Sequence, residues 1–269
     1  MKTINQQLDK LFTEWRLRYK DSKELEKFVA DGLVYKYKPT WGIPKEKENI
    51  PGSDVDLWVE KLWRDSPVRV AFILKDKNTP DGDDVRQWLL LENENGEINR
   101  NLNSRIMKML AAILYGLTID KVGYGQLDYE SLKQKWNTIP FAYVEAKKIA
   151  GGSNVKKKEM IKALKDDGDL LLHEIDFLDP NVLVCFDADD TQFNYITKAY
   201  DKLDEQKITI IKKHDLEPYF KCCLVYYKTL NRVVIKSYHP ISRMADWIIY
   251  EKVISPYRNL LNDYNITLK

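Results

Sequence analysis

The apolar residues of the chain fall into short continuous runs that are separated by amphipathic stretches. The clearest runs are VRVAFIL, which begins at Val68, and NVLVCFD, which begins at Asn181. A short run that is apolar and β-branched is typical of a strand buried on both faces, as in parallel sheets. We expect strands near residues 68–75, 136–140, 181–187 and 232–238. The last of these follows KCCLVYYKT closely enough to form a β-hairpin with it.

Between these runs the apolar positions recur at helical spacing, over residues 3–30, 101–118, 155–178, 188–203 and 245–264. Gly168 is a candidate position for a kink or break. Strands that alternate with helices predict an α/β fold, here a three-layer α/β/α sandwich. We expect a mainly parallel central sheet of about four strands, followed by a C-terminal hairpin and helix.

The domain organisation is suggested by a stretch rich in Pro and Gly at residues 34–53. We therefore expect an N-terminal helical extension and loop over residues 1–60, and the α/β domain over residues 61–269. The chain has 269 residues, of which 44% are apolar, so a sizeable core can form.

Charge and hydropathy narrow the class of protein. Lys and Arg number 43 against 41 Asp and Glu, which excludes a histone-like tail or an acidic solvating chain. No apolar run reaches the roughly 18–20 residues of a membrane span, and the first twenty residues lack the apolar region of a secretory signal. We expect a soluble, cytoplasmic protein that does not bind a membrane.

Cysteine and histidine are scarce. The cysteines are Cys185, Cys222 and Cys223, and two of them are adjacent, which is poor geometry for a shared bridge or for metal ligation. With only three histidines as well, a four-cysteine cluster or a histidine-rich metal centre is not expected. The sequence predicts no metal and no other cofactor.

Candidate chemistry lies just after the predicted strands, because ligands of parallel sheets bind beyond the carboxyl ends of the strands. Asp76 could orient or deprotonate a water, or could simply cap the next helix. Asn137 could read an amide-like heterocycle, or could bond its own backbone in a turn. His239, which Pro240 restricts to extended geometry, could donate a hydrogen bond to a developing anion, or could be an ordinary surface histidine.

A basic stretch precedes one predicted helix. Residues 146–165 contain seven Lys and one Glu, and GGSN comes before the helix. The amino end of a helix attracts anions, so Lys156, Lys157 and Lys158 suggest contact with phosphate. The alternative is a solvated lysine face that the downstream aspartates balance.

Three segments together resemble the uracil-DNA glycosylase superfamily: WNTIP, LLLHEIDFLDPNVLVCFDA and VVIKSYHPISR. The resemblance covers roughly residues 68–243, and the order and approximate spacing of the segments agree. The family's Gly-rich first motif corresponds here to residues 74–78, which contain neither Gly nor Pro. Asp187 replaces a glycine, and Ile241 displaces the serine that follows His-Pro. The chain therefore resembles a divergent member.

The resemblance implies a hydrolase of base excision repair, which flips one nucleotide out of single- or double-stranded DNA and hydrolyses the N-glycosidic bond of a damaged base such as uracil. It implies that Asp76 positions the water and that His239 stabilises the leaving base. Asn137 would bind the base and Trp88 would stack on it, although Trp88 also fits a plain core position. The residues that we expect to bind DNA phosphate are Lys147, Lys148, Ser153, Lys156, Lys157, Ser242 and Arg243.

An alternative function is a catalytically silent protein of the glycosylase fold that binds nucleic acid or a nucleotide. Convergence of Asp76, Asn137 and His239 on one pocket would favour the enzyme. A pocket filled by Lys75 or Lys77 would favour the silent protein.

Overall fold

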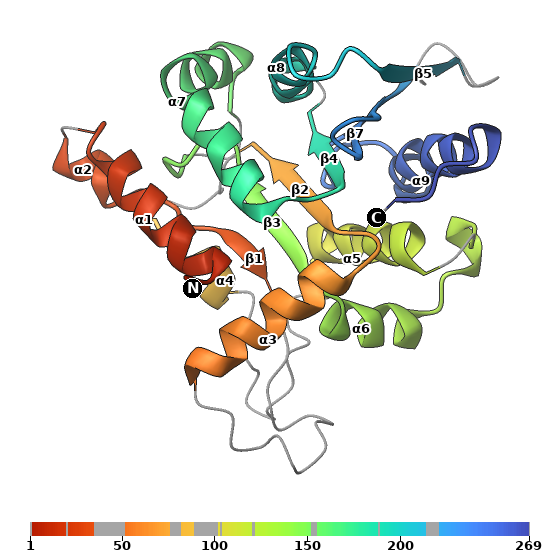
Figure 1. Cartoon of the computed structure of the whole chain (residues 1–269), viewed down its shortest axis with the longest axis horizontal. Helices are drawn as coiled ribbons and strands as arrows, with labels where there is room; N and C mark the ends of the chain where they lie inside the picture. Colours follow the sequence, from red (N-terminus) through yellow and green to blue (C-terminus); the bar gives the residue numbers. More distant parts are fainter. Residues whose placement is uncertain are drawn as a thin grey trace.

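The computed structural model describes residues 2–19, 21–34, 52–75, 82–88, 102, 104–119, 122–151, 155–187, 189–213 and 221–268. Over these residues it is a mixed α/β fold with a seven-stranded sheet in the order β1-β3-β2-β4-β7-β6-β5 (Figure 1). The strands are β1 (Gly32–Val34), β2 (Val70–Leu74), β3 (Phe141–Glu145), β4 (Val182–Phe186), β5 (Lys207–Lys213), β6 (Lys221–Tyr227) and β7 (Arg232–Ser237).

The α/β class is confirmed, but the sheet is larger than the predicted four or so strands. β3, β2, β4 and β7 run parallel to one another and form its centre. β1 pairs antiparallel with β3 at one edge, while β6 and β5 follow β7 antiparallel toward the other edge. The predicted C-terminal hairpin is therefore present as β6 and β7, and the antiparallel strands widen the parallel centre on both sides.

The helices are α1 (Ile4–Arg16), α2 (Ser22–Leu25), α3 (Gly52–Asp65), α4 (Val85–Trp88), α5 (Arg105–Thr118), α6 (Tyr129–Thr138), α7 (Lys157–Leu178), α8 (Thr191–Tyr200) and α9 (Asp246–Asp263), with a short 3-10 helix at Tyr124–Gln126. No helix in the described part of the chain combines the length and apolar character needed to cross a membrane.

The strand predicted at residues 136–140 is wrong, because residues 136–138 are the end of α6 and β3 begins at Phe141. The Asp128 side chain accepts a hydrogen bond from the Ser131 backbone and so starts this helix. Trp136 on α6 is buried and stacks on Phe141, with ring centroids 4.4 Å apart. The aromatic residue of the WNTIP segment therefore packs the helix against the start of the strand.

Gly168 does not break α7, which is continuous over 22 residues. A Cβ at Gly168 would lie 2.3 Å from the ring and hydroxyl atoms of Tyr195 on α8. The glycine is therefore a point of close approach between two helices, and not a kink.

Helices cover both faces of the sheet (Figure 1), and alternate residues of each strand point to opposite cores. Phe72 and Leu74 of β2 belong to a core that α5, α6 and α9 close. Ala71 and Ile73 belong to a second core, which α1, α3, α7 and α8 close. The sheet thus lies between two helical layers.

The N-terminal residues that we expected as an extension contribute to this same fold. Leu8, Phe12 and Trp15 of α1 are buried in the core that α7 shares, and β1 adds a strand to the sheet. Arg18 reaches α7 and makes two hydrogen bonds with the carboxylate of Asp169, at 2.8 and 2.7 Å. Residues 4–34 therefore complete the sheet and one of its cores.

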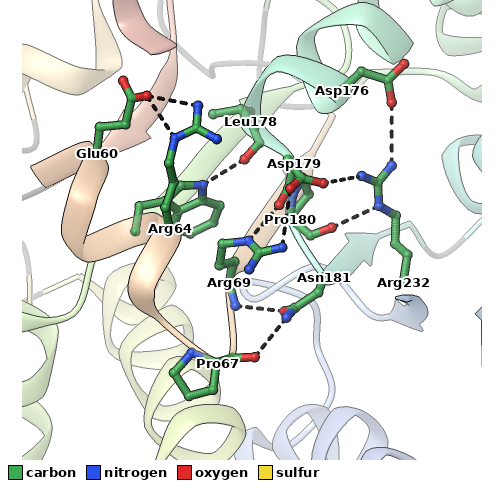
Figure 2. A network of polar contacts seen from close by, with 11 residues as sticks. Glu60, Arg64, Pro67, Arg69, Asp176, Leu178, Asp179, Pro180, Asn181 and Arg232 are labelled. Carbon is green, nitrogen blue, oxygen red and sulfur yellow. Dashed lines mark hydrogen bonds and ion pairs between the residues drawn. The ribbon is translucent and has the colours of Figure 1, made fainter. Parts of the chain in front are cut away.

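A polar network closes the amino end of the parallel strands (Figure 2). The Asn181 side chain accepts a hydrogen bond from the Arg69 backbone and donates one to the Pro67 carbonyl, both at 2.8 Å. Asp179 pairs with Arg69 at 3.3 Å and with Arg232 at 3.1 Å. The starts of β2, β4 and β7 are thereby tied together, and the opposite end of the sheet is where a site can form.

Candidate functional site

The carboxyl ends of β2, β4 and β7 lie side by side, because these strands are parallel neighbours. Each strand delivers a polar residue to that edge: Lys75 follows β2, Asp187 follows β4, and His239 lies two residues beyond β7. The helices α8 and α9 come next in the chain after β4 and β7, so their amino ends start from this edge. We take this carboxyl edge as the candidate functional site.

Asp187 occupies the amino end of α8. Its buried carboxylate accepts hydrogen bonds from the backbone of Asp189, at 3.1 Å, and of Gln192. Burial raises the pKa of Asp187, while these backbone donors and Lys75 act in the opposite direction. The amino end of α8 is therefore satisfied by a carboxylate of the chain itself and is not open to an anionic ligand.

Lys75 and Lys236 at this edge are both ion-paired with the loop that precedes α8. The Lys75 Nζ atom lies 3.0 Å from Asp189 Oδ2, and Lys236 contacts Asp190. Together with Asp187, three carboxyl groups face two ammonium groups. The carboxyl edge around α8 therefore carries no excess of positive charge for a phosphate, and its carboxylates suit a partner that develops positive charge.

His239 is uncharged at neutral pH. Burial, and then the ammonium of Lys75, lower the pKa of His239 to about 4. Its Nδ1 atom accepts a hydrogen bond from the Ile241 backbone at 3.4 Å, and its carbonyl accepts one from the Ser242 backbone at 2.8 Å. With Nδ1 as acceptor, the ring proton lies on Nε2, which is then a neutral hydrogen-bond donor.

Gln192 is a residue of this edge that the sequence did not reveal. Its side chain is fully buried, and Nε2 donates to the Leu74 carbonyl at the end of β2, at 2.9 Å. Within the described part of the chain, its Oε1 atom and the hydroxyl oxygens of Ser237 and Ser242 are buried without a hydrogen-bond partner. Because buried polar atoms are normally paired, these groups have hydrogen-bonding capacity that a buried water could satisfy.

The predicted base reader lies at the wrong end of the sheet. Asn137 is in α6 and precedes β3, whereas His239 follows β7, and β3 and β7 point the same way. The two residues therefore stand at opposite ends of the parallel strands, so Asn137 does not share a cleft with His239. Asp76 lies outside the described residues. Trp88 ends α4, and its side chain is not among those described.

Lys148 is not a phosphate-binding residue, because it is fully buried. Its ammonium lies 2.6 Å from Asp31 and 2.8 Å from Glu174, above the rings of Phe12 and Trp15. Burial opposes the charged ammonium, but the carboxylates of Asp31 and Glu174 raise the Lys148 pKa. Burial, and then the nearby Asp31, raise the pKa of Glu174 well above its usual value. This buried ionic cluster joins the N-terminal segment to α7.

The other predicted phosphate-binding residues differ in their accessibility. Lys156 and Lys157 are exposed at the start of α7, and Arg243 is exposed on the loop after β7. Lys147 is partly buried and donates to the Ile149 carbonyl at 2.6 Å. Ser242 is partly buried, and its carbonyl accepts a hydrogen bond from Arg105 at 2.8 Å. Ser153 lies outside the described residues.

In comparisons with known proteins, no family model matches this chain, and neither does any of the curated proteins.

Proposed function

We propose that this protein is a DNA base glycosylase, a hydrolase that cleaves the N-glycosidic bond of a damaged base such as uracil. The observation that carries the proposal is the position of His239 at the carboxyl end of β7, where burial and Lys75 lower its pKa and the Ile241 backbone donates to Nδ1. Cleavage of this bond leaves an anionic base, and a fixed neutral donor stabilises such an anion in the transition state. The uncharged state of His239 suits this role, since the donor gives a hydrogen bond and keeps its proton.

The carboxylates of the edge support the other half of the reaction. Loss of the base leaves a sugar with the character of an oxocarbenium ion, which nearby negative charge stabilises. Asp187, Asp189 and Asp190 supply more carboxyl groups than the two lysines neutralise. Asp76, one residue beyond Lys75, remains our proposed residue for holding the attacking water.

Gln192 lies at the carboxyl edge, and its Nε2 atom donates to the Leu74 carbonyl at the end of β2. Because its side chain is fully buried, we propose it as a residue that positions the end of β2 and not as a contact to the base. The exposed Lys156, Lys157 and Arg243 are the proposed contacts to the DNA backbone.

The alternative function, a catalytically silent protein that binds nucleic acid or a nucleotide, is favoured by one observation. Lys75 stands directly after β2, where the family places a Gly-rich turn, and its side chain extends to Asp189 in the next loop. A long side chain in this position takes space that a glycine would leave to the sugar.

A cleavage assay over a panel of lesion-containing oligonucleotides tests the proposal. We expect His239→Ala to lose roughly a hundred- to a thousandfold in rate, about 2.7–4 kcal/mol of transition-state stabilisation. His173→Ala is the matched control, because His173 is exposed on α7, and it should cleave like the wild type. Wild-type protein that binds these oligonucleotides but cleaves none of them would establish the silent alternative.

A further inference from the structure

We propose that Lys75 is an amine nucleophile that forms an imine with the aldehyde of an abasic deoxyribose, so that the protein also has a DNA-strand lyase activity. This inference rests on the proposed function, because base excision at the same site produces the abasic sugar. It differs from that function in its bond chemistry, since it breaks a C–O bond to phosphate and not the bond to a base.

The position of Lys75 is fixed by the sheet. It is the first residue after β2, which has a parallel neighbour on each side. Its carbonyl accepts a hydrogen bond from the Lys147 backbone at 2.9 Å, which extends the pairing of β2 with the β3 side of the sheet. A side chain that starts from such a backbone has a defined origin, as a positioned nucleophile requires.

The ammonium group of Lys75 is sheltered but still reachable. The side chain is 18% exposed, and its partner Asp189 is 40% exposed, with 3.0 Å between Nζ and Oδ2. Lys148 provides the contrast, because its side chain is 0% exposed and lies between two buried carboxylates. Of these two lysines, only Lys75 has a side chain that a large substrate can reach.

The sheet places Lys75 at the proposed active site. Its ammonium pairs with Asp189 in the turn before α8, which follows β4. Because β4 pairs parallel with both β2 and β7, the loop that carries His239 leaves the same edge of the sheet as Lys75. A DNA strand bound at this edge would therefore lie close to both residues.

The proposed reaction balances without an added oxidant or reductant. The neutral amine attacks the aldehyde carbon, the carbonyl oxygen takes up a proton, and loss of water gives a protonated imine. A base then removes a proton from the adjacent sugar carbon. The electron pair of that C–H bond forms a C=C bond to the next sugar carbon, whose C–O bond breaks to release the 3′-phosphate, and hydrolysis of the imine returns the free lysine. Asp189, freed from the ammonium, is the nearest described carboxylate to accept the proton.

The test is covalent trapping on a preformed abasic oligonucleotide with borohydride, which adds hydride to an imine and links protein to DNA permanently. We expect wild-type protein to be trapped and Lys75→Arg to be trapped at least tenfold less. Arginine keeps the charge and the pairing with Asp189, but it is not an amine nucleophile. The matched control is Lys198→Arg, an exposed lysine of α8, which should be trapped like the wild type. Peptide mass spectrometry should locate the adduct on Lys75.

A second variant separates nucleophilic from structural roles. Asp189 is the proposed acceptor of the sugar proton, whereas the imine forms at Lys75. Asp189→Asn should therefore still be trapped by borohydride, while its cleavage of the DNA strand falls. An Asp189 that only holds Lys75 in place would lower trapping and strand cleavage together.

The outcomes are distinguishable from those of the base-excision assay. Equal trapping of wild type and Lys75→Arg, or no trapping of wild-type protein between pH 6 and 9, overturns the inference even if bases are excised. Trapping at Lys75 without excision of any base supports the inference and contradicts the glycosylase proposal.

Discussion

The charge of a single side chain depends on what surrounds it, and His239 shows this most directly. Its imidazole lies partly buried beside Lys75, and both features disfavour protonation. In the sequence, His239 is one histidine followed by Pro240, which indicates a fixed loop but says nothing about Lys75. The neutral state therefore could not be predicted from the sequence, although the position at the carboxyl end of a strand could.

We predict that His239 titrates near pH 4 in the folded protein. Base excision should then be independent of this residue's ionisation between about pH 5.5 and 8 and should change only as the pH falls toward 4. NMR titration of histidine-labelled protein, with His239→Gln to assign the signal, measures this directly. A midpoint near 6.5 would contradict the prediction.

The lowered pKa of His239 also has a consequence for stability. The unfolded chain binds the proton near pH 6.5, before the folded protein does near pH 4. The contribution of His239 is therefore fully present above about pH 6.5 and is lost as the pH falls, by up to about 3 kcal/mol. Replacement by Gln should remove this part of the acid dependence in urea unfolding experiments.

Lys148 is expected to be the most sensitive residue of the buried ionic cluster. Lys148→Met should lower the free energy of unfolding by about 3–5 kcal/mol, because it leaves Asp31 and Glu174 buried without their counter-ion. Glu174→Gln should cost less, since the raised pKa of Glu174 already favours its uncharged form. Urea denaturation compares the two variants. A Lys148→Met protein as stable as Glu174→Gln would show that the cluster is not held by the lysine.

At the scale of elements, the sequence predicted the buried parallel strands best. β2 and β4 are continuous apolar runs because both of their faces are covered, and this pattern is visible in the sequence. β1 has only three residues, and its pairing with β3 depends on residues more than a hundred positions away. The strand expected at 136–140 failed because a capped helix, packed through Trp136, extends to Thr138.

The contact of α7 with α8 at Gly168 gives a prediction for two elements together. Gly168→Ala should destabilise the protein by about 1–3 kcal/mol, because the new Cβ overlaps the Tyr195 ring. Tyr195→Ala in the same chain should remove the overlap, so that Gly168→Ala costs little in that background. A thermal-denaturation double-mutant cycle measures the coupling. Additive effects of the two changes would contradict the close approach.

At the scale of the whole molecule, exposed lysines that we propose as DNA contacts gather in one short segment. Lys156, Lys157 and Lys158 are exposed at the start of α7. The Lys-rich segment was visible in the sequence, but the burial of Lys148 was not. Its partner Asp31 lies 117 positions away in the chain, so no local pattern indicates the pair.

We predict that DNA binding weakens steeply with salt and that the triple change of Lys156, Lys157 and Lys158 to Ala lowers the salt slope. The loss should approach about three units for duplex DNA and about two for single strands, if each lysine contacts one phosphate. The matched control changes Lys10, Lys198 and Lys202 to Ala, which removes the same charge from other exposed positions. Equal slopes for the two triple variants, measured by fluorescence anisotropy, would rule out the start of α7 as the DNA contact.

The pairing of β1 with β3 and of Arg18 with Asp169 has a consequence for how the protein is made. A ribosome releases α1 and β1 well before their partners, since Arg18 and Asp169 are 151 positions apart. The apolar side of α1, with Phe12 and Trp15, is therefore exposed to solvent while the middle of the chain is translated. Contacts between residues so far apart in the sequence slow folding. We therefore expect a chaperone to bind the apolar side of α1 while the chain is being synthesised.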